Sequence, residues 1–166
     1  NAFEIYVTSV ADRMYTHNAD DPWPTLGELV ALDERVILFY FNQPKCREQT
    51  CPTPAWHYWF DFASETGFRF QSVAELNDNE SSCAPRGGRA PEIRDFYRVN
   101  AFVELPVADA SDILNSYDYI VQRTNACATV QGQAVNFYSV DFWSHGDLPR
   151  FVQDTNRERA AAGTAV

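Results

Sequence analysis

The stretch Val135-Asn136-Phe137-Tyr138-Ser139-Val140-Asp141-Phe142-Trp143 is dense in β-branched and aromatic residues. Turn-forming residues bound it, Gly132 before it and Ser144-His145-Gly146 after it, so it predicts one short buried strand. A carboxylate, Asp141, stands near the end of that strand, where an ionisable group is costly unless something pairs with it. In parallel α/β barrels catalytic groups sit at the carboxyl ends of the strands. Asp141 is therefore the first candidate catalytic residue.

A second strand is predicted at Arg35–Phe41, which is continuously apolar after its first residue, as in a parallel strand covered on both faces. Before it, Thr25 and Glu28 have the spacing of a capping box. They predict a short helix that ends at Asp33-Glu34 and buries its apolar residues, Leu26, Leu29, Val30 and Leu32. A helix followed at once by a strand is the αβ half of a βαβ unit, so the sequence predicts an α/β fold with parallel strands.

The rest of the chain adds further elements of the same kind. They are a short strand at Phe68–Ser72, a loop over Val73–Arg94, a strand at Asp95–Leu105, a helix from Asp109 or Ser111 to about Thr124, and a last helix opened by Asp147-Leu148-Pro149. The Ala/Gly/Thr tail, residues 160–166, is expected to fray.

Composition limits the classes of protein to consider. A chain of 166 residues with 45% hydrophobic residues is long and apolar enough to form one globular domain. Its formal charge of −10 argues against nonspecific binding to nucleic acid, whose phosphates would be repelled. No apolar run approaches the roughly 20 residues of a membrane span.

Four cysteines allow three disulfide pairings. Cys46 and Cys51 flank a short polar loop and are expected to pair locally, which leaves Cys83 with Cys127. The alternative is four free thiols in a cytosolic protein; zinc is a weaker alternative, because no CxxC or HxxxH spacing is present. We favour disulfides in a secreted protein.

Two further observations agree with secretion. Asn79-Glu80-Ser81 is an N-glycosylation sequon, although such triplets occur often by chance. The chain begins at Asn1 rather than Met, as a processed piece would.

The other histidines are weaker candidates for chemistry. His17 lies among polar residues away from the end of any apolar strand, which is typical of a loop histidine. His57 belongs to the aromatic cluster Trp56–Phe62, where a packed histidine is more common than a ligand.

The chain resembles the secreted fungal and plant proteins that have a phosphatidylinositol-specific phospholipase C X-type domain. Four stretches in the same order carry the resemblance over nearly the whole chain. They are Trp23-Pro24-Thr25-Leu26-Gly27-Glu28-Leu29, Ser82-Cys83 with Arg86-Gly87, Tyr97-Arg98-Val99-Asn100-Ala101-Phe102 and Asn136–Phe142. The first of these is fairly specific, and the other three are weak individually.

The resemblance implies a TIM-like (β/α) barrel of the phospholipase C-like phosphodiesterase type, of which residues 1–166 are the C-terminal half. Such barrels run to about 250 residues, and half a barrel would leave strand edges unpaired. We therefore expect the N-terminal half of the barrel on a second chain, produced by nicking of one precursor.

The resemblance also implies a mechanism. One histidine deprotonates the inositol 2-hydroxyl, a second protonates the leaving oxygen, and an arginine or Ca²⁺ stabilises the phosphoryl charge. Those histidines, the arginine and any Ca²⁺ ligands would lie upstream, in the other half. Asp141 would orient the first histidine, while Asn100, Trp143 and His145 would line the same mouth. A structural role for Asp141, pairing with an arginine or capping a loop, is the alternative.

The expected function is a phosphodiester hydrolase that acts on a phosphoinositide-like ligand. The alternative is a secreted, non-catalytic binding protein or toxin on the same barrel. Ala101 stands where relatives often carry His or Tyr, which bears on the substrate. A hydrolase with paired carboxylates ranks last, because no pair of carboxylates stands at the expected strand ends.

Overall fold

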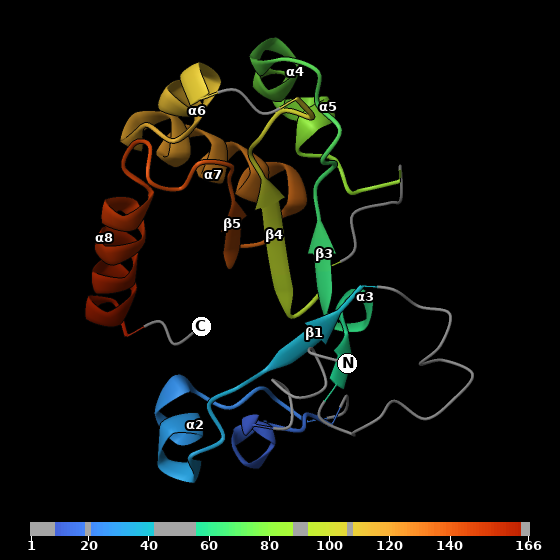
Figure 1. Ribbon diagram of the computed structural model, residues 1–166, viewed down its shortest axis with the longest axis vertical. Helices are drawn as coiled ribbons and strands as arrows, with labels where there is room; N and C mark the ends of the chain where they lie inside the picture. Colours follow the sequence, from blue (N-terminus) through green and yellow to red (C-terminus); the bar gives the residue numbers. More distant parts are fainter. Residues whose placement is uncertain (1–8, 19–20, 42–55, 88–92, 106–107, 164–166) are drawn as a thin grey trace. The chain divides into compact units, whose positions relative to one another are not determined.

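The computed structural model of the protein describes residues 9–18, 21–41, 56–87, 93–105 and 108–163 (Figure 1). The chain divides into two compact units, Asn1–Phe62 and Ala63–Val166. Each unit has a small sheet of its own, and every strand pair in both sheets is parallel. The predicted α/β class with parallel strands is confirmed.

The first unit is built around two short strands. Its elements are the 3₁₀ turn η1 (Ala11–Arg13), the helix α2 (Leu26–Leu32), the strands β1 (Leu38–Tyr40) and β2 (Trp56–Tyr58), and the helical turn α3 (Trp59–Phe62). β1 lies beside β2 with Leu38 opposite Trp56. The predicted strand Arg35–Phe41 is thus shorter than expected, and the residues of β1 are half-buried rather than covered on both faces.

The capping box at the start of α2 is confirmed. The Glu28 backbone N–H donates to Thr25 Oγ1 over 3.2 Å, and the Thr25 N–H donates to Glu28 Oε2 over 2.8 Å. Of the apolar residues on α2, Leu29 is buried, whereas Leu26, Val30 and Leu32 are 79%, 59% and 62% exposed. The prediction that those three residues are buried is therefore wrong. The helix is therefore held by its cap and by one buried leucine.

The second unit contains the larger sheet, ordered β3-β4-β5 (Figure 1). Its strands are β3 (Ala63–Glu65), β4 (Phe96–Asn100) and β5 (Phe137–Ser139), and its helices are α4 (Val73–Asn77), α5 (Asn79–Ser82), α6 (Ala108–Leu114), α7 (Tyr117–Gln131) and α8 (Leu148–Ala161). The predicted strand Asp95–Leu105 and the predicted last helix are both found, the strand in shortened form. The tail expected to fray from residue 160 overlaps α8, which continues through Ala161, and residues 164–166 lie outside the described part.

The strand predicted over Val135–Trp143 pairs over three residues, and Phe137 is 41% exposed. The chain leaves the ladder after Ser139 and bends at Phe142, whose φ of +49° no strand can accommodate. The prediction of a fully buried nine-residue strand is therefore wrong.

Other predicted boundaries also differ from the structure. The single helix expected up to Thr124 is two helices, α6 and α7, separated at Asn115-Ser116, and Cys127 lies within α7. The region predicted as a loop after residue 72 contains α4 and α5, Phe68–Ser72 forms no strand, and β3 was not predicted.

One face of the larger sheet is closed by α7. Tyr97 and Val99, which alternate on β4, pack with Cys83, Cys127 and Val135 in one buried cluster. Cys83 and Cys127 form a disulfide, which confirms that predicted pairing. Cys46 and Cys51 lie outside the described residues, so their pairing stays a prediction.

Removal of this disulfide should destabilise the second unit. Cys83 and Cys127 are 44 residues apart, and closing a loop of that length lowers the entropy of the unfolded chain by an amount equivalent to about 4 kcal/mol. We expect the double variant Cys83→Ser, Cys127→Ser to lose that much free energy of unfolding in urea titrations. The double variant Cys46→Ser, Cys51→Ser is the control, because its short loop should contribute less. A larger loss in the control would contradict the prediction.

Candidate functional site

The carboxyl ends of β3, β4 and β5 lie side by side and form the first candidate site. Glu65 at the end of β3 lies opposite Arg98 on β4, and Asn100 at the end of β4 lies opposite Ser139 at the end of β5. Ligands of parallel α/β proteins bind at this end of the sheet, because loops from several strands converge there. The predicted site residues belong to this edge or to the loop after β5.

Asp141 lies two residues beyond the end of β5 in a bend and is half-buried. The backbone of this bend is held by Asn115, whose Nδ2 donates to the carbonyls of Asp141 at 2.9 Å and Phe142 at 3.2 Å. Among the described residues, the Asp141 carboxylate itself has no hydrogen-bond or ion-pair partner. The bend therefore fixes the backbone of Asp141 and leaves its carboxylate available to another group.

His145, on the same loop, pairs with a different carboxylate. Its Nδ1 lies 2.8 Å from Asp112 Oδ1 on α6, and both side chains are partly exposed. The His145 ring also meets the Phe142 ring edge-on, with centroids 5.8 Å apart. His145 is thus tied to α6 by Asp112.

The other two predicted binding residues lie in different environments. Trp143 is 69% exposed on the loop after β5. Asn100 is 2% exposed, its backbone N–H donates to Thr66 Oγ1, and its Nδ2 donates to the Thr66 carbonyl over 3.0 Å. The structure therefore places Asp141, Trp143 and His145 on one loop, and it places Asn100 inside the sheet, where it joins the ends of β3 and β4.

The sequence did not predict the buried acid at this edge, Glu65. Glu65 is 2% exposed and accepts hydrogen bonds from Arg86, at 2.5 Å, and from Arg98. Two guanidinium groups offset the cost of burying one carboxylate. No pattern in the sequence marked Glu65 as a buried acid, because no strand was expected over residues 63–65. Its charge is already satisfied within the chain, which suits a structural role better than a catalytic one.

The first unit contains a second cluster of titratable groups around His57. His57 is 4% exposed, its Nε2 accepts the His17 backbone N–H over 2.9 Å, and its Nδ1 lies 3.2 Å from the Leu38 carbonyl. Nδ1 must carry the ring hydrogen, because a carbonyl only accepts. The prediction of a packed histidine is confirmed. Burial lowers the pKa of His57, the nearby His17 lowers it further, and the bond to the Leu38 carbonyl opposes both.

His17 lies in a loop, as predicted, but it is buried at 8% exposure. Its ring stacks on Trp23 with centroids 3.7 Å apart and meets Phe62 edge-on at 5.4 Å. The two histidines thus belong to one aromatic core.

The described residues contain no group of three or more His, Cys, Asp or Glu side chains placed to hold a metal ion. None of the described helices is long and apolar enough to cross a membrane. Asn79, the predicted glycosylation site, is the half-buried first residue of α5. The Ser81 hydroxyl of its sequon donates to Asp78 Oδ2 over 2.8 Å.

No protein-family model matches the chain. No curated protein and no solved structure matches it either.

The loop after β5 should be sensitive to a methyl group at Gly146. Its φ is +83°, and a Cβ there would lie 2.3 Å from the Asn115 carbonyl oxygen, which is backbone and cannot move aside. We expect Gly146→Ala to lower the free energy of unfolding by about 3 kcal/mol.

Gly132→Ala is the matched control for this prediction. Gly132 also has a positive φ, +67°, but a Cβ there would meet nothing within 4 Å. Gly132→Ala should therefore lower the free energy of unfolding only by the cost of placing an alanine in the left-handed conformation, about 1 kcal/mol. Equal losses for the two variants in chemical denaturation would show that the contact with Asn115 is unimportant.

Stability of the first unit should fall in mild acid because of His57. A histidine whose folded-state pKa is lowered binds a proton more readily when unfolded, so its contribution is present above its ordinary pKa of 6.5 and is lost as the pH falls below that value. We expect the free energy of unfolding to decrease below about pH 6.5. In His57→Gln the decrease of the free energy of unfolding with falling pH should be smaller, whereas in His145→Gln it should be unchanged. NMR titration of the His57 ring showing a pKa above 6.5 would contradict the prediction.

Proposed function

We propose that this chain is part of a secreted phosphodiester hydrolase of the phosphatidylinositol-specific phospholipase C-like kind. The observation that carries the proposal is Asp141, a half-buried carboxylate just beyond the end of a parallel strand, with its backbone fixed by Asn115. A carboxylate at that position is suited to orienting a histidine, because one imidazole nitrogen then donates to it while the other reacts. The four sequence stretches of the resemblance support the same proposal.

We propose further that the chain forms part of a TIM-like barrel completed by a companion segment with the remaining strands. Two features support this. The larger sheet has three strands in the described residues, whereas a barrel of this kind needs eight. On the side of the sheet opposite α7, Phe96 and Phe137 meet edge-on at 5.8 Å while Phe137 is 41% exposed. By register and alternation Glu65 and Arg98 share this face, so further strands would cover a face that is partly apolar and partly charged.

In the proposed reaction, a histidine of the companion segment takes the proton from the attacking hydroxyl. The oxygen then bonds to phosphorus, and a second histidine gives its proton to the alkoxide that leaves. Asp141 is a positioning residue: it would accept a hydrogen bond from the first histidine, fix its tautomer and stabilise the imidazolium that forms. The disulfide between Cys83 and Cys127 agrees with a secreted protein, since such bonds persist in oxidising compartments.

A non-catalytic binding protein on the same scaffold is the second candidate. The observation that agrees with it is the lack of any imidazole beside the Asp141 carboxylate in the part of the chain that the structure describes, which the enzyme would have to obtain from the companion segment. The histidine on the same loop, His145, is paired with Asp112 instead. A binding protein would retain the fold without needing the two reactive histidines.

The decisive assay is hydrolysis of phosphatidylinositol in vesicles by the native assembly that contains this chain. We expect turnover, and we expect Asp141→Asn to lower kcat by about 10³-fold while KM changes little, because an orienting carboxylate acts in the transition state. The acidic limb of the pH profile should move to lower pH, since the imidazolium loses its partner.

Asp118→Asn is the matched control, because it makes the same change at an exposed residue of α7. It should leave kcat unchanged. An intact assembly with no phosphodiesterase activity would favour the binding protein, and equal losses in the two variants would remove Asp141 from the mechanism.

A further inference from the structure

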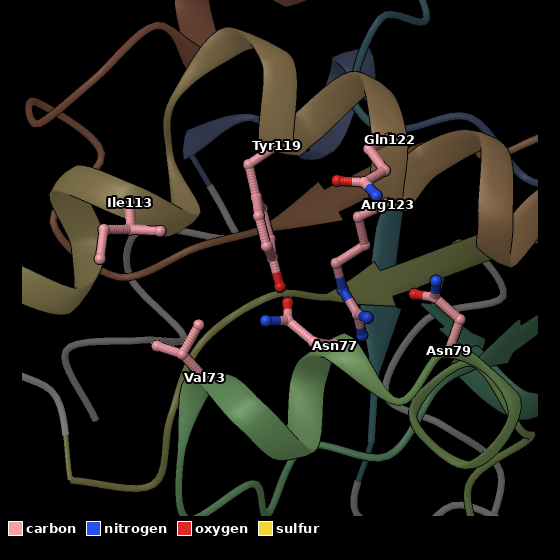
Figure 2. Close-up of a pocket in the computed structure, with 7 residues that line it drawn as sticks. All are labelled: Val73, Asn77, Asn79, Ile113, Tyr119, Gln122 and Arg123. Carbon is pink, nitrogen blue, oxygen red and sulfur yellow. The ribbon is translucent and has the colours of Figure 1, made fainter.

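A separate pocket lies between the helices of the second unit (Figure 2). It has a volume of about 320 Å³, enough for a small organic ligand. The lining residues come from α4, α5, α6 and α7, and they are Val73, Asn77, Asn79, Ile113, Tyr119, Gln122 and Arg123. No acidic side chain is among them.

The base of this pocket is a buried cation. Arg123 is 2% exposed, and its two terminal nitrogens donate to acceptors on α4, α5 and β4. These acceptors are the Leu76 carbonyl, the Ser82 hydroxyl and carbonyl, and the Asn100 carbonyl, at 2.9 to 3.4 Å. All of them are neutral, and no carboxylate among the described residues pairs with Arg123. Its Nε is buried with no hydrogen-bond partner in the described part of the chain.

Such a charge is unusual, because a buried ion is normally balanced by one of opposite sign. Glu65 illustrates the usual case in the same unit, since two arginines surround it. The guanidinium stays protonated at neutral pH, so its field reaches into the adjoining pocket. The neutral carbonyls orient the Arg123 side chain but do not cancel its charge.

Hydrogen-bond donors surround this charge. Figure 2 shows the Tyr119 hydroxyl directed toward the Asn77 amide, and the Gln122 and Asn79 amides line the same pocket as Arg123. Within the described residues, none of these four side chains makes a hydrogen bond. A ligand in the pocket could therefore accept from a hydroxyl and three amides without displacing any protein contact.

We propose that the pocket binds a small organic oxyanion, either a carboxylate or a phosphoryl group. The amides and the Tyr119 hydroxyl would donate to its oxygens, and Arg123 would balance its charge from behind. Val73 and Ile113 would contact an apolar part of the ligand. The formal charge of −10 repels anions over most of the surface, so a local cation is needed for such a ligand to bind. The proposal is independent of the phosphodiesterase chemistry at Asp141.

The test should use protein made without N-linked glycans, because Asn79 is both a lining residue and the predicted glycosylation site. Inorganic phosphate and acetate are titrated separately at constant ionic strength, and the side-chain amide signals of Asn77, Asn79 and Gln122 are followed by NMR. We expect saturable shifts of these signals with at least one anion at millimolar concentrations. The anion that binds more tightly identifies phosphoryl or carboxylate as the preferred group.

Arg123→Ala is a poor variant for this test, because it would remove four structural hydrogen bonds. Asn77→Asp and Gln122→Glu instead replace an exposed amide by a carboxylate of the same shape. Each puts a negative charge beside the bound anion and should weaken binding about tenfold or more. Asn125→Asp is the matched control on an exposed position of α7 that does not line the pocket, and it should change the affinity less than about twofold.

Three outcomes would overturn the proposal. The first is an absence of saturable shifts with both anions. The second is equal weakening by Asn125→Asp and Asn77→Asp, which would mean that the anions respond only to net charge. The third is binding of glucose with the same shifts and the same affinity as the anions, which would mean that the site does not recognise charge.

Discussion

The guanidinium of Arg123 holds the second unit together at its centre. Its hydrogen bonds connect α7 to the end of α4, to α5 and to the end of β4, which lie 23 to 47 residues away from Arg123 in the sequence. The disulfide between Cys83 and Cys127 fixes α7 to the same region covalently. Because Arg123 is bound by carbonyls rather than by a carboxylate, it joins these segments while its charge remains unbalanced. Arg123 thus stabilises the fold and also places an unbalanced positive charge beside a pocket.

Asn115 has a comparable role for the loop after β5. It interrupts what the sequence predicts as one helix, and its backbone carbonyl accepts the Asp147 N–H over 2.7 Å at the start of α8. Its side chain binds the backbone of Asp141 and Phe142. The bend that carries Asp141 is therefore fixed from the junction of α6 and α7 and not by pairing within the sheet.

The two units differ in the kind of ionisable group that they bury. In the first unit, His17 and His57 lie in an aromatic core, where burial lowers the pKa of His57. In the second, Glu65 and Arg123 are buried as charges, one balanced by two arginines and one bound only by neutral groups. The pocket beside Arg123 thus differs from the Glu65 site, because its buried charge has no carboxylate partner among the described residues and lies against an open volume.

Features that depend on neighbours along the chain could be predicted from the residues alone. The capping box of α2, the α/β class and the proline-opened last helix follow from local spacing, and the Cys83–Cys127 pair followed once a local Cys46–Cys51 pair was assumed. The tertiary structure decided the rest. β5 ends early because Asn115, from another element, binds the backbone that would have continued the strand, and Asn100 became a buried link through Thr66. The burial of Arg123 could not be predicted from the sequence, because a charged residue within a helix is usually solvated. Only the packing of α4, α5 and β4 around it makes it a buried cation.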